Sequence, residues 1–120
     1  MRERGSAVVE FALVVPLLVL VLLATVEVAL IARAQLEVSQ AAREGAREAA
    51  ATPDPGQAVA VVRSFLGEPM ASRTRVTVSR DHLVGGRAEV TVRVQHPLAG
   101  GLLRGLSVTL EGRSSMRVER

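Results

Sequence analysis

The sequence predicts an α+β chain in which one long N-terminal helix precedes a small helix and a three-stranded antiparallel sheet. Two patterns predict this class. Residues 11–32 are almost continuously apolar and lead into alanine-rich helix formers as far as residue 51. After a break rich in proline and glycine, valine alternates with polar residues over residues 74–79, 88–95 and 106–118. This period of two is typical of strands with one buried face.

The apolar N-terminal stretch has the length of a membrane span. It is uncharged over residues 11–26 and continues beyond Glu27 to residue 32, which gives about 22 residues, enough for a hydrocarbon core of about 30 Å. All sides of this helix are apolar, unlike those of an amphipathic helix on a soluble domain. Because Arg2 and Arg4 precede the span, we expect the N-terminus on the cytoplasmic side and the rest of the chain exported.

Two residues interrupt the apolar span. Pro16 lies in its first third, where it removes one backbone hydrogen bond and is expected to kink the helix, which membrane helices tolerate. Glu27 lies near the outer end. Its carboxylate either reaches the membrane interface or contacts a partner helix, and the sequence leaves both interpretations open.

The N-terminal junction combines small residues with a carboxylate. Gly5 and Ser6 precede the apolar run, and Glu10 follows at its edge; an ionisable residue in a membrane segment is a functional-site hypothesis. A cut after Gly5 would give Ser6 a free ammonium group one helical turn from Glu10, and the two charges could then pair. In a second interpretation Glu10 is only interfacial. A third places a signal cleavage after Ala34, which would release a secreted soluble protein.

The helix beyond the span carries a narrow stripe of small residues. Its members, at three- and four-residue steps, are Ala34, Val38, Ala41, Ala42, Gly45 and Ala49. Such a face lets another helix or sheet approach closely. We expect residues 52–56 to end this helix and residues 57–66 to form a short helix that helps to cover the sheet.

The three strands are expected to follow one another along the chain. Residues 81–86 are predicted to join the first two as a hairpin, and residues 96–101 to separate the second from the third. The apolar positions of the third strand fall in two groups, residues 106–110 and 116–118.

The sequence contains no pattern typical of an enzyme or of a cofactor site. There is no cysteine, the two histidines stand apart, and no P-loop, dinucleotide fingerprint or H-E-x-x-H motif is present. All 15 basic residues are arginine, interleaved with 12 acids, and aromatic residues make up 2% of the chain. Because basic runs and stacking platforms are both missing, nucleic-acid binding is not expected. We expect no enzymatic activity, no cofactor, no metal and no small-molecule substrate.

Several of these residues resemble a known family. The stretch RGSAVVEFALVVPLLVLVLLATVEVA over residues 4–29, followed by AAREGAR at 41–47, is similar to the TadE-like family of tight-adherence (Tad/Flp) pilus proteins. The start also resembles the class III signal of type IV pilins and pseudopilins. Val28 and Ala29 stand where that family often has an aromatic residue and a glycine. The ending SMRVE at 115–119 is similar to the common C-terminal strand of the family.

The resemblance implies a pilin-like fold and a role in pilus assembly, adhesion or secretion. A membrane prepilin peptidase would cleave after Gly5, and the product would be a minor pilin or pseudopilin assembled through its N-terminal helix. Its partners would be the membrane, the peptidase, other pilin or TadE-like subunits and the Tad inner-membrane platform. It would lie in the cytoplasmic membrane as a single-pass protein, with pilus association at the cell surface as a further location.

These expectations divide the chain into four parts: a leader over residues 1–5, a transmembrane helix over 6–32, an exported helix extension over 33–52, and a small extracytoplasmic α+β domain over 53–120. Two other functions stay open. The protein could remain in the membrane as a non-polymerising accessory of the assembly platform, or it could be the secreted soluble protein cut after Ala34.

Overall fold

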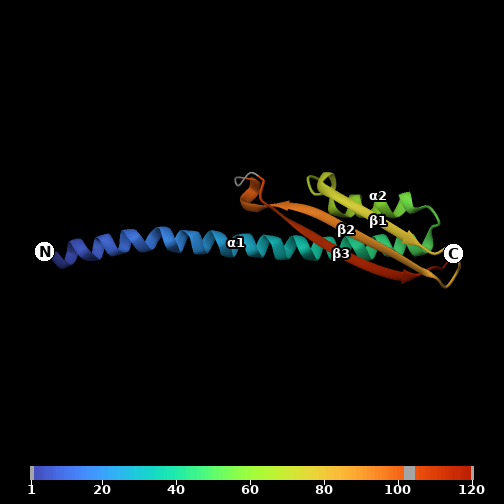
Figure 1. Ribbon diagram of the computed structural model, residues 1–120, viewed down its shortest axis with the longest axis horizontal. Coiled ribbons are helices and arrows are strands. Elements are labelled where there is room, and N and C mark those ends of the chain that lie inside the picture. Colours follow the sequence, from blue (N-terminus) through green and yellow to red (C-terminus); the bar gives the residue numbers. More distant parts are fainter. Residues whose placement is uncertain (1, 102–104, 120) are drawn as a thin grey trace. The chain divides into compact units, whose positions relative to one another are not determined.

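The computed structural model describes residues 2–101 and 105–119 (Figure 1). In chain order the elements are helix α1 (Arg2–Ala51), helix α2 (Pro55–Leu66), the 3-10 turn η1 (Ala71–Arg73), strand β1 (Thr74–Arg80), strand β2 (Arg87–Pro97), the 3-10 turn η2 (Leu98–Gly101) and strand β3 (Ser107–Arg117). The predicted fold class is confirmed, since a long N-terminal helix, a second helix and a three-stranded antiparallel sheet form a pilin-like α+β arrangement. The chain forms two units, Met1–Ile31 and Ala32–Arg120.

The first unit is an apolar stretch of α1. Large apolar side chains are exposed along its length, among them Leu13, Leu20, Leu22 and Leu30. Burial of apolar surface is favourable by about 25 cal/mol per Å², so an apolar environment would stabilise this helix. The hydroxyl of Thr25 donates to the carbonyl oxygen of Val21 at 2.8 Å, which satisfies the polar group within the helix itself.

The second unit is built on the C-terminal part of α1. Its buried face is made of small residues, namely Ala34, Val38, Ala41, Ala42, Gly45, Ala46, Ala49 and Ala50. The predicted stripe is therefore confirmed, and Ala46 and Ala50 widen it. Since these side chains are short, α2 and the sheet lie close along this part of the helix (Figure 1).

Helix α1 ends at Ala51, as predicted, and α2 begins at Pro55, two residues before its expected start. The carboxylate of Asp54 accepts a hydrogen bond from the backbone N–H of Gly56 at 2.9 Å. Pro55 takes the first helical position, where its missing N–H costs nothing and its fixed φ suits the helix. A cap followed by proline thus explains the earlier start. Ala58 and Val62 form the buried face of α2.

Strand β2 is the centre of the sheet, with β1 and β3 antiparallel on either side. The register pairs Val76 with Val92, and Val92 with Gly112. The predicted alternation is confirmed most clearly in β2, where the buried residues are Ala88, Val90, Val92 and Val94. The core of the unit therefore lies between this face of the sheet and the small-residue face of α1 together with α2.

Strand β2 is longer than predicted, whereas β3 lies within the predicted range of residues 106–118. His96 and Pro97, expected in a break, are the last residues of β2 and pair with Val108 and Ser107. Pro97 is compatible with this position because it lies at the end of the strand, where a missing donor matters least. The third strand continues through residues 111–115, which the sequence pattern had left between two apolar groups. Its central position is Gly112, whose missing side chain hid the alternation.

The hairpin between β1 and β2 spans residues 81–86, as predicted. Asp81 closes it, because its carboxylate accepts from the N–H of Arg87 at 2.9 Å while its own N–H donates to the carbonyl of Arg87 at 3.0 Å. The chain beyond β3 then fastens the loop: the N–H of Val118 donates to Gly86 O at 2.8 Å, and the N–H of Gly85 donates to Val118 O at 2.9 Å.

Candidate processing and helix-packing site

Gly5 and Ser6 lie within α1, close to its N-terminal end. Both are exposed, and a Cβ added at Gly5 would meet no atom within 4 Å. The first four N–H groups of a helix have no partner within the helix, and glycine in a helix costs about 1 kcal/mol relative to alanine. This end is therefore the part of α1 that opens most readily. Met1, the first residue of the expected leader, lies outside the described residues.

Glu10 is exposed and stands among apolar residues. Within the described part of the chain it makes no hydrogen bond or ion pair. Ser6 and Glu10 are four residues apart in one helix, so their side chains lie on the same face, with Cβ atoms about 5–6 Å apart. This places the carboxylate within side-chain reach of a charge at Ser6.

The other two predicted residues of the span have different surroundings. Pro16 lies inside α1, which stays helical on both sides of it; the carbonyl of Ala12, four residues earlier, receives no N–H from it. A kink at this position remains a prediction. Glu27 is half-buried, whereas Val26 and Val28 beside it are exposed.

The predicted packing residues beyond the span pack against other segments of the same chain. Ala41, Ala42 and Gly45 are fully buried in the second unit. A Cβ added at Gly45 would lie 2.5 Å from Cγ2 of Val62 and 3.1 Å from Cγ1 of Val90. Helix α2 and strand β2 thus meet at this glycine, and its role is to let them approach α1.

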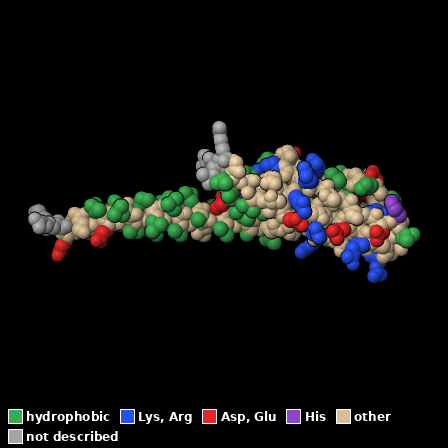
Figure 2. All heavy atoms as spheres, viewed as in Figure 1, with side chains coloured by type: hydrophobic (Ala, Val, Ile, Leu, Met, Phe, Trp, Pro, Cys, Tyr) green, Lys and Arg blue, Asp and Glu red, His purple; other side chains and the backbone are tan. Residues whose placement is uncertain are grey.

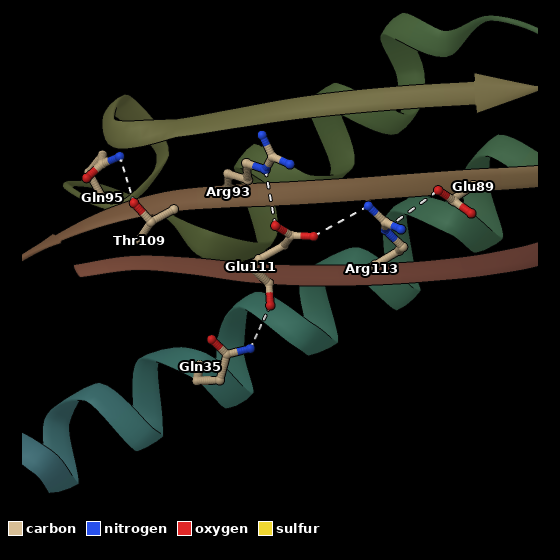
Figure 3. A network of polar contacts seen from close by, with 7 residues as sticks. All are labelled: Gln35, Glu89, Arg93, Gln95, Thr109, Glu111 and Arg113. Atoms are coloured by element: carbon tan, nitrogen blue, oxygen red, sulfur yellow. Dashed lines mark hydrogen bonds and ion pairs between the residues drawn. The ribbon is translucent and has the colours of Figure 1, made fainter.

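Sequence reasoning missed a second close approach, at Gly112 of β3. A Cβ there would lie 2.7 Å from the carbonyl oxygen of Val38 and 3.0 Å from Cα of Ser39. Next to it, the side-chain amide of Gln35 donates to the backbone oxygen of Glu111 at 2.7 Å (Figure 3). A glycine within an alternating strand is a signal of close backbone approach, but it does not identify the partner segment.

Two further hydrogen bonds join the end of α1 to the sheet. The Nε–H of Arg80 donates to the carbonyl of Ala49 at 2.8 Å, and the backbone N–H of Glu119 donates to the carbonyl of Ala50 at 3.0 Å. The last carbonyls of a helix have no partner within it, so these contacts satisfy them. They also fix the sheet against the C-terminal end of α1.

An exposed apolar N-terminal helix joined to a small α+β unit defines the chain as a pilin-like protein with one long helix. The helix Glu3–Ala51 is the one candidate among the described residues that is long and apolar enough to cross a membrane, and signal sequences near an N-terminus share these properties. Residues 5–47 match the family described as TadE-like protein. No curated protein and no solved structure matches the chain.

The family match begins at Gly5 and ends at Arg47. It therefore includes the junction, Glu10, the exposed apolar helix and most of the small-residue face, while α2 and the sheet lie outside it. The TadE-like family is associated with Tad pilus components and is generally non-enzymatic.

Proposed function

We propose that the protein is a minor pilin or pseudopilin of a Tad-type pilus or secretion apparatus, cut after Gly5 by a prepilin peptidase and assembled through its N-terminal helix. The observation that carries the proposal is the arrangement at the start of α1. An accessible Gly5–Ser6 bond precedes a carboxylate at Glu10 and an exposed apolar helix, within a segment that matches the TadE-like family.

Access to the cleavage bond supports this assignment. A peptidase needs the chain in an extended form, and the Gly5–Ser6 bond lies near the end of a helix, where opening costs least. The competing cut after Ala34 is less accessible. Ala34 is buried in the second unit, and Gln35 is held there by its hydrogen bond to Glu111. That bond also lies well inside α1.

The position of Glu10 supports a role in assembly. A carboxylate near the bilayer centre costs about 2.5–3.5 kcal/mol on insertion scales, and a pair with an ammonium group offsets part of this cost. After cleavage Ser6 would carry such a group, on the same face of the helix. In a filament the partner of Glu10 would be its own Ser6 or that of a neighbouring subunit, and the second arrangement would set the register between subunits.

The exposed apolar helix would serve both states of such a protein. In the membrane its side chains contact lipid, with the N-terminus cytoplasmic and the second unit outside. In an assembly the same surface packs on neighbouring helices, which adds van der Waals contact. A non-polymerising accessory of the platform would share the processing step and the anchor, but it would stay in the membrane.

The first test is the N-terminal residue of protein purified from its native membrane, by intact mass. A chain beginning at Ser6 is expected. A chain that retains Met1 would make it an unprocessed anchor, and one beginning at Gln35 would make it a secreted protein; either would contradict the proposal. Fractionation of sheared pili then separates a filament subunit, found with the pili, from a platform accessory, found in membranes alone.

The role of Glu10 is tested by Glu10→Gln, which keeps the size of the side chain and removes its charge. Cleavage is expected to continue while incorporation into sheared pili is lost. Glu3→Gln is the matched control, because it makes the same change on the same helix within the segment that cleavage removes, so incorporation should persist. Normal incorporation of Glu10→Gln would contradict the assembly role of Glu10.

A further inference from the structure

The outer face of the sheet, opposite the core, is rich in arginine. Charged and polar side chains gather over this unit, whereas hydrophobic side chains cover the visible face of the N-terminal unit (Figure 2). The outward positions of the three strands carry five arginines and two glutamates: Arg75, Arg87, Arg93, Arg113 and Arg117 against Glu89 and Glu111. The face therefore has a positive excess of three charges.

The two glutamates form ion pairs with arginines at one part of this face. Arg93 Nε lies 3.2 Å from Glu111 Oε2, and Arg113 lies 3.6 Å from the other oxygen of Glu111 and 3.7 Å from Glu89 (Figure 3). Glu111 is thus shared by two arginines. In Figure 3 the Nη atoms of Arg93 lie on the side away from Glu111, toward β1. Among the described residues these Nη atoms have no acceptor, so they are available to a ligand.

A hollow of about 520 Å³ opens next to these donors, lined by Ser72, Arg73, Thr74, Arg75, Arg93, Gln95 and Thr109. Arg75 and Arg93 are direct cross-strand partners in the register, an arrangement of like charges that destabilises a sheet unless something compensates it. Within the described residues, neither Arg73 nor Arg75 has a carboxylate within ion-pair distance. The Nε of Arg73 is buried and has no hydrogen-bond acceptor among the residues that the structure describes.

Gln95 and Thr109, two neutral residues of the hollow, are hydrogen-bonded to each other. The amide of Gln95 donates to Thr109 Oγ1 at 3.1 Å (Figure 3). The side-chain oxygen of Gln95 accepts from the hydroxyl of Ser107 at 3.0 Å. Because the Thr109 oxygen accepts this bond, its own hydroxyl hydrogen is left to donate. The hollow is therefore lined by three arginines and by Thr109, whose hydroxyl can donate. Among the described residues, only Arg93 of these three arginines is in an ion pair, with Glu111.

We propose that this hollow binds a multivalent oxyanion of the phosphate class, held by Arg73, Arg75 and Arg93. Guanidinium groups match phosphate oxygens in pairs of parallel hydrogen bonds, and a multivalent anion neutralises more than one of them, whereas a single carboxylate does not. The ligand is either a soluble phosphate compound or the phosphate of a lipid headgroup. This site lies outside the segment that matches the TadE-like family, and it does not depend on processing at Gly5.

The test uses the full chain in a nonionic detergent, titrated with inorganic pyrophosphate at constant ionic strength and followed by calorimetry. Arg75→Gln is expected to weaken binding about tenfold or more, the loss of one charge-assisted contact. The matched control is Arg117→Gln, which makes the same change on the same face opposite Arg87, away from the hollow. It should bind within about twofold of the wild type. Equal weakening by both variants would indicate diffuse attraction to the face and overturn the site, as would the absence of pyrophosphate binding.

Thermal unfolding shows whether a variant that binds less pyrophosphate is still folded. Without ligand, Arg75→Gln should unfold at the wild-type temperature or above it, because it removes a cross-strand repulsion. Pyrophosphate should raise the unfolding temperature of the wild type and of Arg117→Gln but not that of Arg75→Gln. A rise in all three would overturn the proposal.

A soluble ligand and a lipid headgroup are distinguished by measuring pyrophosphate binding in nanodiscs of phosphatidylcholine with and without phosphatidic acid. Weaker pyrophosphate binding in the acidic discs supports the site with a headgroup ligand, and unchanged binding supports it with a soluble one.

Discussion

The close packing at Gly45 gives a quantitative prediction for Gly45→Ala. A helix interior favours alanine over glycine by about 1 kcal/mol, so the substitution would stabilise α1 if the site were open. The new methyl carbon, however, would lie 2.5 Å from Cγ2 of Val62 and 3.1 Å from Val90. Both valines are fully buried, and β-branched side chains have few alternative rotamers.

Overpacking of a core costs about 1–3 kcal/mol, and at this separation we expect the upper half of that range. After the helix propensity is subtracted, Gly45→Ala should destabilise the second unit by about 1–2 kcal/mol. For a unit of this size, that lowers the unfolding temperature by about 4–15 °C. Since the chain has no Trp and no Tyr, the measurement is far-UV circular dichroism, with amide hydrogen exchange of strand β2 as a local readout.

A double mutant separates overpacking from other effects. Val62→Ala alone leaves a cavity and should cost about 2 kcal/mol. With Gly45→Ala added, the new methyl group partly fills that cavity, so the pair should be about 1–2 kcal/mol more stable than the sum of the single changes. Gly5→Ala is the control, because a Cβ there meets no atom within 4 Å, and it should leave the second unit unchanged. A stabilising Gly45→Ala, or additive behaviour of the pair, would refute the reasoning.

Three further predictions follow from particular contacts. Gly112→Ala should destabilise the second unit by about 1–3 kcal/mol in thermal unfolding, because its Cβ would meet the backbone oxygen of Val38 at 2.7 Å. A backbone atom can move less than a side chain to relieve such a contact. A loss below about 0.5 kcal/mol, the range of a neutral surface change, would contradict this packing. Asp54→Ala should cost about 1 kcal/mol through loss of the cap on Gly56, with faster hydrogen exchange confined to the start of α2, while Asp54→Asn should retain most of the stability. Arg113→Ala should change stability by less than about 1 kcal/mol despite its two ion pairs, because both are exposed, and an effect that persists in high salt would be against this explanation.

The elements with a strong local signal could be predicted from the sequence alone. Three patterns are each contained in one segment of the sequence. They are the uncharged apolar run, the small-residue stripe from Ala34 to Ala49, and the valine alternation of β2. The break after Ala51 and the hairpin of residues 81–86 are also local, since proline, glycine and aspartate set the backbone there. The candidate residues Gly5, Ser6 and Glu10 were found in the same way, and their roles stay predictions.

Which segments contact one another could not be predicted from the sequence and is seen only in the fold. In the sequence, Gly112 only interrupts the alternation of a strand; in the fold, the backbone of Val38 packs against it. Gly45 is one of several small residues in the sequence, and only the fold shows that Val62 and Val90 pack against it. The hollow lined by arginines could not be predicted from the sequence either. Arg75 and Arg93 are 18 positions apart and become neighbours only through the register of β1 and β2. The physical reason is that a period fixes which face of an element is buried, whereas register and close approach depend on the surface of the partner that covers it.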